Sequence, residues 1–278
     1  MMQLYSDVCF ECNKVITNAY STSFSLGIKM FSSELRMPVY AIYGFVRFAD
    51  EIVDTFHDHD KKVLLDDFRI ETYKAINQKL SLNPVLHSFQ EVVWKYGIEP
   101  ELIDAFLDSM EMDLHKSIYN KSELDKYIYG SAEVVGLMCL HVFLNGDKQK
   151  YKSLRPYACA LGAAFQKINF LRDLKSDFLE RGRVYFPNVD FNKFTEADKL
   201  KIENDIQKDF EYAYKGIVQL PKSSRLGVYC AYKYYLNLFH KIKSEPASTV
   251  VQKRIRVSDK RKIYLLATSA LKHNLNLL

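Results

Sequence analysis

The chain has 278 residues, of which 48% are hydrophobic and 26% are charged, and its formal net charge is +5. This composition supplies enough apolar material for a globular core, and so small a charge gives no reason to expect nucleic-acid binding. Only 10 glycines and 7 prolines are present, and apolar residues recur with a helical period along nearly the whole chain, which predicts an all-α fold. No linker rich in glycine, serine or proline interrupts it, so we expect one domain over residues 1–278.

The predicted elements are helices separated by short breaks. They cover residues 5–18, 22–30, 38–56, 61–79, 84–95, 99–117, 122–144, 150–180, 195–219, 222–243 and 258–274. The breaks contain the proline, glycine and asparagine residues that usually separate helices, as at Ser81–Pro84, Gly97–Pro100 and Ser244–Pro246.

Aromatic and basic residues are used unevenly along the chain. There are 19 tyrosines and 18 phenylalanines against one tryptophan, which fits either a large core bordered by tyrosine or an aromatic-lined cavity for a long apolar ligand. The dense basic run Lys253–Lys262 is interpreted as a solvated face, with binding of an anionic ligand or a membrane surface as the alternatives.

The cysteines and apolar segments bear on location. An odd number of cysteines, five, with no secretory leader indicates reduced thiols in a cytoplasmic protein. Cys9 and Cys12 have zinc-like spacing but lack a matching second pair, so we expect no zinc. The longest uncharged apolar stretch, near Val134–Leu144, is too short to span a bilayer. We therefore expect a soluble protein, with peripheral contact at the inner membrane surface as an alternative.

Pairs of aspartates four residues apart are the main candidates for chemistry. The chain contains Asp50/Asp54, Asp54/Asp58, Asp104/Asp108 and Asp173/Asp177. Residues at this spacing share a helix face, and such pairs are common on exposed helices, so the spacing alone indicates little. The first and last of these pairs stand in apolar sequence, where unpaired charges would be costly, and we interpret them as the functional ones.

Each of these two pairs belongs to a polar stripe on an otherwise apolar helix. At about 100° per residue, Arg47, Asp50 and Asp54 fall within an arc of roughly 60°. In the second segment, an arc of roughly 80° contains Gln166, Asn169, Asp173 and Asp177. A helix that is apolar nearly all round is buried, so each stripe must face an internal cavity or be neutralised. A purely structural network of aspartate and arginine is the alternative.

A divalent cation would resolve the repulsion between carboxylates that share a helix face. Mg²⁺ prefers oxygen ligands and typically binds through one or two carboxylates together with substrate phosphates, and Mn²⁺ is an acceptable substitute. The arginines suit a diphosphate, because guanidinium matches phosphate geometry. The predicted metal ligands are Asp50, Asp54, Asn169, Asp173 and Asp177.

At these residues the chain resembles the squalene/phytoene synthase family of head-to-head prenyl synthases, and the resemblance covers nearly the whole chain. The segments that carry it are Tyr20–Phe24, Tyr43–Asp54, Tyr127–Met138, Gln166–Asp177 and Gly182–Pro187, with Tyr235 and Arg254 near the end. The chain departs from the family pattern at four of these positions. Tyr20 replaces a common histidine, Glu51 an aspartate, Glu133 a glycine and Ser176 a glutamate.

The resemblance implies the isoprenoid synthase fold, a helical bundle with a central cavity. It also implies roles for individual side chains. Catalysis falls to Asp50, Asp54, Asp173, Asp177 and Tyr127. Substrate binding falls to Ser21, Ser23, Phe24, Arg47, Gln166, Asn169, Arg172, Tyr235 and Arg254.

The implied reaction joins two identical allylic diphosphates through a cyclopropylcarbinyl diphosphate, with release of diphosphate. We expect two geranylgeranyl diphosphates to give phytoene, because the segments around Gly182–Pro187 and Val134–Met138 look more like the phytoene branch. Farnesyl diphosphate would instead give dehydrosqualene, or squalene if NADPH is used. The alternatives are a head-to-tail elongase or terpene cyclase on the same fold, and a catalytically inactive assembly factor. We expect a monomer or weak dimer that contacts membrane, if at all, during product release.

Overall fold

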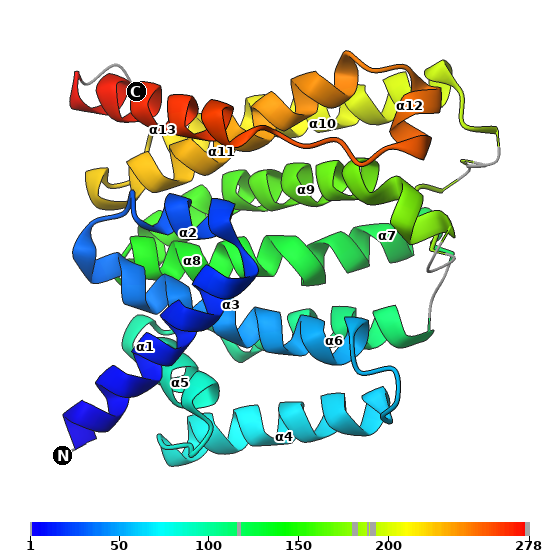
Figure 1. The fold of residues 1–278 in the computed structure, drawn as a ribbon. Coiled ribbons are helices and arrows are strands. Elements are labelled where there is room, and N and C mark those ends of the chain that lie inside the picture. The colour runs from blue at the N-terminus through cyan, green and yellow to red at the C-terminus, as the bar shows by residue number, and fades with distance from the viewer. Residues whose placement is uncertain (1, 116–117, 180–182, 188, 190–192, 276–278) are drawn as a thin grey trace.

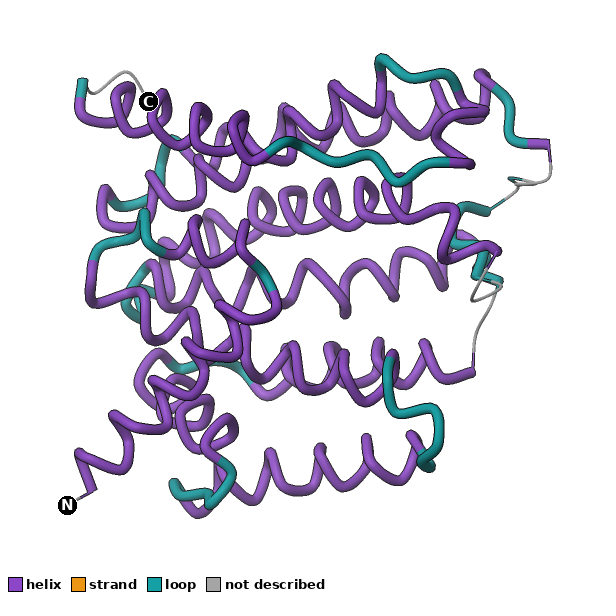
Figure 2. Tube along the Cα trace, in the orientation of Figure 1, coloured by secondary structure: helices purple, strands orange, loops and turns teal. Residues whose placement is uncertain are grey.

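The computed structural model describes residues 2–115, 118–179, 183–187, 189 and 193–275. Its elements are α1 (Met2–Tyr20), α2 (Thr22–Ile28), α3 (Ser33–Asp54), α4 (Lys61–Gln78), α5 (Pro84–Tyr96), α6 (Pro100–His115), α7 (Lys121–Ile128), the π-helix η1 (Tyr129–Glu133), α8 (Val134–Phe143), α9 (Lys148–Leu179), α10 (Glu196–Ile217), α11 (Lys222–Lys243), α12 (Ala247–Gln252) and α13 (Asp259–Asn274). Apart from one isolated bridge between Ile118 and Val184, the described part of the chain contains no β-structure (Figure 2). The all-α prediction is confirmed.

Local sequence explains most of the helix ends. The Asn83 side chain accepts hydrogen bonds from the first turn of α5, and Pro84 occupies a position where a missing N–H costs nothing. Gly97 ends that helix in the left-handed conformation, with φ of +66°. At the start of α7, Asn120 and Glu123 cap one another's backbone amides. These signals were visible in sequence, and the helix between Pro84 and Gly97 was predicted to within one residue.

Three element predictions were wrong in detail. Helix α3 begins at Ser33, not at Pro38, so the proline lies inside the helix. The helix expected over residues 122–144 is interrupted by η1, where Gly130 brings the chain so close to α6 that an added Cβ would lie 2.3 Å from the Ala105 carbonyl oxygen. The short helix α12, which follows Pro246, was not predicted. Residues 116, 117 and 180, included in two predicted helices, lie outside the described residues.

The helices pack as a bundle around α9, with α10 on one side and α8 and η1 on the other (Figure 1). Helix α3 packs against α1, α5, α6 and α8. Its Phe45 is fully buried and stacks on Phe89 at 4.0 Å between ring centroids, with Phe68 and Phe106 around it. Two apolar clusters result, and Val228 packs against both. The expectation of a single domain stays a prediction.

One end of the bundle collects the ends of three helices. The C-terminal ends of α3, α6 and α9 all lie on the right in Figure 1, where α4 and α7 begin. A helix carries partial negative charge at its C-terminus and partial positive charge at its N-terminus, so the ends of α3, α6 and α9 favour a nearby cation, whereas the starts of α4 and α7 do not. Both predicted acidic pairs lie in the last turns of α3 and α9.

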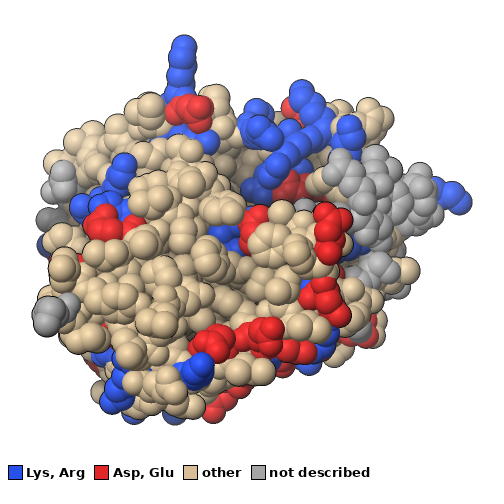
Figure 3. Space-filling view, turned by 60° about the horizontal axis from the view of Figure 1, so that its bottom comes forward, with Lys and Arg blue, Asp and Glu red and all other residues tan. Residues whose placement is uncertain are grey.

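Charged side chains are also unevenly distributed on the surface. In Figure 3, acidic side chains form a band along the lower face, and basic side chains gather at the upper right. Within the described ranges, no helix has both the length and the apolar composition needed to cross a bilayer.

Candidate active site

Helix α3 presents the first polar stripe. The Nε of Arg47 donates to Oε2 of Glu51 at 3.0 Å, and the guanidinium lies 4.3 Å from the centre of the Tyr20 ring. Glu51 also accepts a hydrogen bond from the Thr55 hydroxyl at 2.6 Å. Tyr20 and Glu51, two residues that depart from the family pattern, therefore both contact the Arg47 guanidinium. Because this pairing lies within the helix, Asp50 and Asp54 do not have to neutralise the arginine.

Asp50 carries the most perturbed carboxyl of this stripe. Burial raises its pKa to about 7, and the nearby charges of Asp54 and Asp113 add to the rise, while Arg47 opposes it. The protein therefore disfavours the ionised form of Asp50 in the absence of a cation.

The second stripe lies at the end of α9. Asp173 accepts from Nε of Arg172 at 3.0 Å and forms an ion pair with Nε of Arg254 at 2.7 Å. Arg254 comes from the segment between α12 and α13, about eighty residues further along the chain, so the fold brings a predicted diphosphate ligand to a predicted metal ligand. Asp177, one turn later, is buried.

The amide side chains of the second stripe meet a tyrosine from α11. The Tyr235 hydroxyl donates to Oδ1 of Asn169 at 3.3 Å, and Asn169 in turn lies 3.5 Å from Oε1 of Gln166. The Tyr235 ring stacks on Phe165 at 3.9 Å, and burial raises the pKa of its hydroxyl. The structure thus places Tyr235 beside the acidic segment.

The segment Tyr20–Phe24, which the family resemblance assigns to substrate binding, lies against α3. Ser21 caps α2 by accepting from the Phe24 amide at 3.2 Å, and Phe24 stacks on Tyr43 at 4.8 Å. Ser23 is partly buried in the same turn. Burial raises the pKa of Tyr43, and the nearby Asp50 and Tyr235 raise it further. Tyr43 therefore connects the α2 segment, the first acidic stripe and α11.

A buried aspartate that the sequence analysis did not single out links the two stripes. Asp113, near the end of α6, accepts from the Tyr127 hydroxyl at 2.8 Å. Burial raises its pKa to about 6, Arg183 opposes the rise, and the charges of Asp54 and Asp177 add to it. Because those two aspartates come from α3 and α9, Asp113 lies within electrostatic reach of both acidic segments.

Arg183 is the cation of this cluster. Its Nη1 lies 3.6 Å from Oδ1 of Asp113 and 3.8 Å from Oδ1 of Asp54, and its Nη2 donates to the Asp113 carbonyl at 2.9 Å. Arg183 belongs to Gly182–Pro187, one of the segments that resemble the family, but no role was predicted for it from the sequence. Asp113 could have been noticed because it follows the buried Phe106 and Met110 by seven and three residues, on the same face of α6.

Tyr127 lies in a cluster of aromatic rings. Its centroid is 5.2 Å from Tyr119, 5.5 Å from Tyr185 and 6.1 Å from Phe170. Burial, followed by the charge of Asp113, raises its pKa well above the usual value. The hydroxyl therefore stays protonated and acts as a hydrogen-bond donor rather than as a base.

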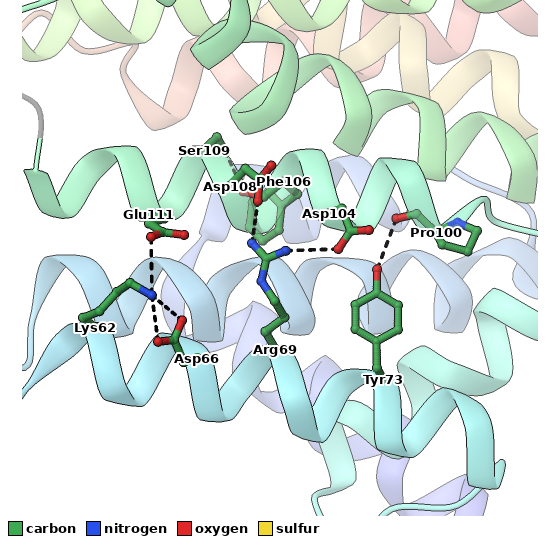
Figure 4. Close-up of polar contacts among 10 residues, drawn as sticks. All are labelled: Lys62, Asp66, Arg69, Tyr73, Pro100, Asp104, Phe106, Asp108, Ser109 and Glu111. Atoms are coloured by element: carbon green, nitrogen blue, oxygen red, sulfur yellow. Dashed lines mark hydrogen bonds and ion pairs between the residues drawn. The ribbon is translucent and has the colours of Figure 1, made fainter.

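Other sequence candidates lie apart from this cluster. Asp104 and Asp108, another pair with the same spacing, both bind Arg69 of α4, at 3.1 and 2.6 Å (Figure 4). Glu133, in η1, has a pKa raised by burial and contacts Cys159 of α9. The charges of Asp209 in α10 and Lys167 in α9 also shift the pKa of Glu133. None of the predicted metal ligands is among the groups that shift it.

The cluster fits a divalent cation shared with a ligand. Among the described residues, no three His, Cys, Asp or Glu side chains are close enough to hold an ion by themselves. Mg²⁺ usually binds through one or two carboxylates and takes its other ligands from phosphates and water. Asp50 and Asp54, in the last turn of α3, provide such a half-site, and the raised pKa of Asp50 reflects the cost of ionising it without a cation.

This electrostatic strain predicts a pH effect on stability. A carboxyl whose pKa is higher in the folded state destabilises the fold as pH rises from the unfolded pKa, near 4, to the folded pKa. For Asp50 that window ends near pH 7. In EDTA, we expect Asp50→Asn to be more stable than the parent at pH 7.5, by about 2 kcal/mol, and equal to it at pH 4. Thermal unfolding of both proteins across this range is the measurement, and a difference independent of pH would contradict the prediction.

A large cavity elsewhere does not involve the predicted site. A cavity of about 750 Å³ lies beside α1, α3 and α5, with Phe10, Met37 and Trp94 among its lining residues. No residue assigned to the site lines it. The central cavity implied by the resemblance stays a prediction.

The fold and this cluster define a helical prenyltransferase. The model of the family described as "Squalene/phytoene synthase" matches residues 17–261, and the chain therefore belongs to that family. It is 28% identical to phytoene synthase 1 of Solanum lycopersicum, over 95% of this chain and 68% of the relative, and 28% identical to phytoene synthase 2 of the same plant, over 95% and 90%.

Solved structures agree with this fold. A dehydrosqualene synthase superposes with a TM-score of 0.83 at 22% identity, over 99% of both chains. The squalene synthase HpnC of Alicyclobacillus acidocaldarius gives 0.75 at 20% identity, over 86% of this chain and 95% of that one. The predictions of the isoprenoid synthase fold, of the family and of a transferase are confirmed.

Proposed function

We propose that this enzyme condenses two molecules of geranylgeranyl diphosphate head to head into phytoene and releases diphosphate. The observation that carries the proposal is the meeting of two acidic stripes from α3 and α9 at one end of the bundle, with Asp113 and Arg183 between them. Arginines border both stripes, so a polyphosphate would find anion ligands and metal ligands side by side.

The arginines would bind the diphosphates by exchanging partners. In this structure Arg47 pairs with Glu51, while Arg172 and Arg254 share Asp173. Asp50, Asp54, Asn169, Asp173 and Asp177 would hold Mg²⁺, which as a Lewis acid neutralises charge on a leaving diphosphate. When Asp173 serves as a metal ligand, Arg172 and Arg254 become available to the diphosphate oxygens.

The aromatic side chains would protect the allylic cation formed when diphosphate leaves. Faces of tyrosine and phenylalanine attract cations, and a dry surface prevents their capture by water. Tyr235, stacked on Phe165, borders the second stripe, and Tyr127 lies in the cluster with Tyr119 and Tyr185. The protonated Tyr127 hydroxyl would orient Asp113 without taking a proton from the substrate.

The chain length of the donor and the final quenching step decide the product. The names of the relatives favour phytoene, whereas two farnesyl diphosphates would give dehydrosqualene, or squalene with NADPH. Head-to-tail elongation is a weaker alternative, because neither acidic segment of this sequence has the doubled aspartates usual in elongases. An inactive assembly role is weaker because all four aspartates of the two acidic pairs are present. The cytoplasmic location stays a prediction. All five cysteines are free thiols, and the tomato relatives are named chloroplastic.

Incubation with defined substrates tests this function. Purified protein with Mg²⁺ and geranylgeranyl diphosphate should yield a C40 hydrocarbon with the mass of phytoene, independently of NADPH. Farnesyl diphosphate and NADPH are supplied in parallel reactions, and Asp50→Asn serves as the inactive control. A C30 product only would reassign the donor, a head-to-tail diphosphate would reassign the reaction, and absence of any product would favour the assembly role.

A further inference from the structure

Positive charge is concentrated in the last part of the described chain. Residues 253–275 contain seven lysines and arginines and one acidic residue, a net charge of +6. The whole chain carries +5, so the remaining residues together carry −1. Six of these bases are exposed: Lys253, Arg254, Arg256, Lys260, Arg261 and Lys272. Only Arg254 of this segment pairs with the acidic cluster described above.

Helix α13 in the same segment has an exposed apolar face. At 100° per residue, Ile263, Tyr264, Ala267, Leu271 and Leu275 fall within an arc of about 120°. Ile263 is 64% exposed and Leu271 61%, while Leu265 and Ser269 on the opposite side are buried, and α13 packs against α11. This set of five residues is called the α13 apolar face below. A helix that is apolar on both its inner and outer sides needs a second partner.

Bases flank the α13 apolar face. Arg261 and Lys272 lie next to it on one side of the helix, and the Arg261 guanidinium is 5.0 Å from the centre of the Tyr264 ring. Their field extends to α11, where the pKa of Lys233 is lowered by burial and then by Lys272 and Arg261. The face therefore carries apolar and cationic side chains together, and anions near it would relieve the repulsion between the bases.

We propose that the α13 apolar face and its flanking bases dock on an anionic lipid bilayer. An amphipathic helix with leucine, isoleucine and tyrosine beside lysine and arginine is the chemistry that binds the boundary between headgroups and acyl chains, and the bases attract anionic headgroups. A second copy of the chain is disfavoured, because its equivalent surface would carry the same positive charge. Docking rests on no step of the proposed reaction.

Helix α4 provides a matched control surface. Its Val63 is 53% exposed and its Ile70 is 62% exposed. These two residues are seven positions apart, as Tyr264 and Leu271 are in α13. The bases beside this pair are matched by acids, because Lys62 binds Asp66 at 2.6 Å (Figure 4) and Lys74 binds Glu71 at 3.2 Å. Exposed apolar area alone would give both helices the same affinity for lipid, whereas charge complementarity favours α13 only.

Co-sedimentation with vesicles tests the proposal. Vesicles of phosphatidylcholine, with or without 30% phosphatidylglycerol, are mixed with the full chain, Ile263→Ser/Leu271→Ser, Arg261→Glu/Lys272→Glu and Val63→Ser/Ile70→Ser. We expect the parent to bind the anionic vesicles about tenfold more tightly than the neutral ones, and both α13 variants to lose about tenfold on anionic vesicles. The α4 variant should bind like the parent, and raising the salt concentration should weaken the parent's binding.

Several outcomes would overturn docking at this face. They are parent protein that stays in the supernatant, equal binding to neutral and anionic vesicles, and α13 variants that bind like the parent. Loss of a concentration-dependent dimer in Ile263→Ser/Leu271→Ser, without vesicle binding by the parent, would assign the face to a second copy instead. Circular dichroism of each variant checks its fold, and turnover with prenyl diphosphates is scored separately. A protein that binds vesicles but makes no hydrocarbon would refute the proposed function and leave this inference standing.

Discussion

Asp50→Asn and Asp173→Asn are each expected to lower turnover of prenyl diphosphate by about 10³-fold with Mg²⁺ present. The amide keeps the size of the carboxyl but removes the charge that a cation needs. Stability should separate the two variants, because the fold strains Asp50 and stabilises Asp173. Asp50→Asn removes a carboxyl whose pKa is raised to about 7, whereas Asp173→Asn leaves Arg172 and Arg254 without their shared acid. We therefore expect a higher unfolding temperature for the first and a lower one for the second, both in EDTA.

The pair Asp104/Asp108 gives a matched control with the same spacing on a different helix. Both side chains are about half exposed and bind Arg69 (Figure 4), so Asp104→Asn should cost at most about 1 kcal/mol of stability and leave turnover unchanged. Steady-state rates and thermal unfolding of the three variants are the measurements. Full activity in both Asp50→Asn and Asp173→Asn would refute the metal site, and an inactive Asp104→Asn would mean that the assay reports folding instead.

Sequence predicted the two acidic stripes because their chemistry is local. Arg47, Asp50 and Asp54 share one face of one helix, and helical geometry alone determines that they lie together. The same holds for Asn169 and Asp173. The flanking apolar residues indicate burial, so both the position and the surroundings of each stripe could be expected before the fold was known.

The link between the stripes could not be obtained in this way. Asp113 lies on a third helix, and only the tertiary arrangement, in which α6 packs against α3 and Arg183 follows α9, brings it near Asp54 and Asp177. Arg254 similarly reaches Asp173 through the course of the chain after α12. The start of α3 was predicted wrongly for a local reason, because a proline such as Pro38 often marks a helix start. The helix in fact begins at Ser33, where the Ser32 hydroxyl donates a hydrogen bond to the Glu34 carboxylate at 2.6 Å. Family resemblance supplied Arg254, whereas no pattern of residues near Asp113 distinguishes it from an ordinary surface acid except its place on the buried face.

Asp113→Asn is expected to weaken activation by Mg²⁺ about tenfold or more and to lower turnover at low Mg²⁺. Arg183 now lies between two acids, 3.6 Å from Asp113 and 3.8 Å from Asp54. Once Asp113 loses its charge, the buried guanidinium has Asp54 as its nearest remaining carboxylate and must pair with it, because an unpaired buried charge is costly. Asp54 would then be withdrawn from the metal.

This mechanism differs from simple loss of structure in a way that titration detects. If Arg183 competes with the cation for Asp54, saturating Mg²⁺ should restore most of the turnover, because the two equilibria are linked by mass action. Tyr127→Phe removes the hydrogen bond to Asp113 at 2.8 Å but leaves its charge, so its Mg²⁺ dependence should change far less. Rates measured over a Mg²⁺ series for both variants decide the matter. Equal half-activating concentrations in Asp113→Asn and the parent, or lost turnover that excess Mg²⁺ does not restore, would show that Asp113 acts on the reaction by some route other than the charge of Asp54.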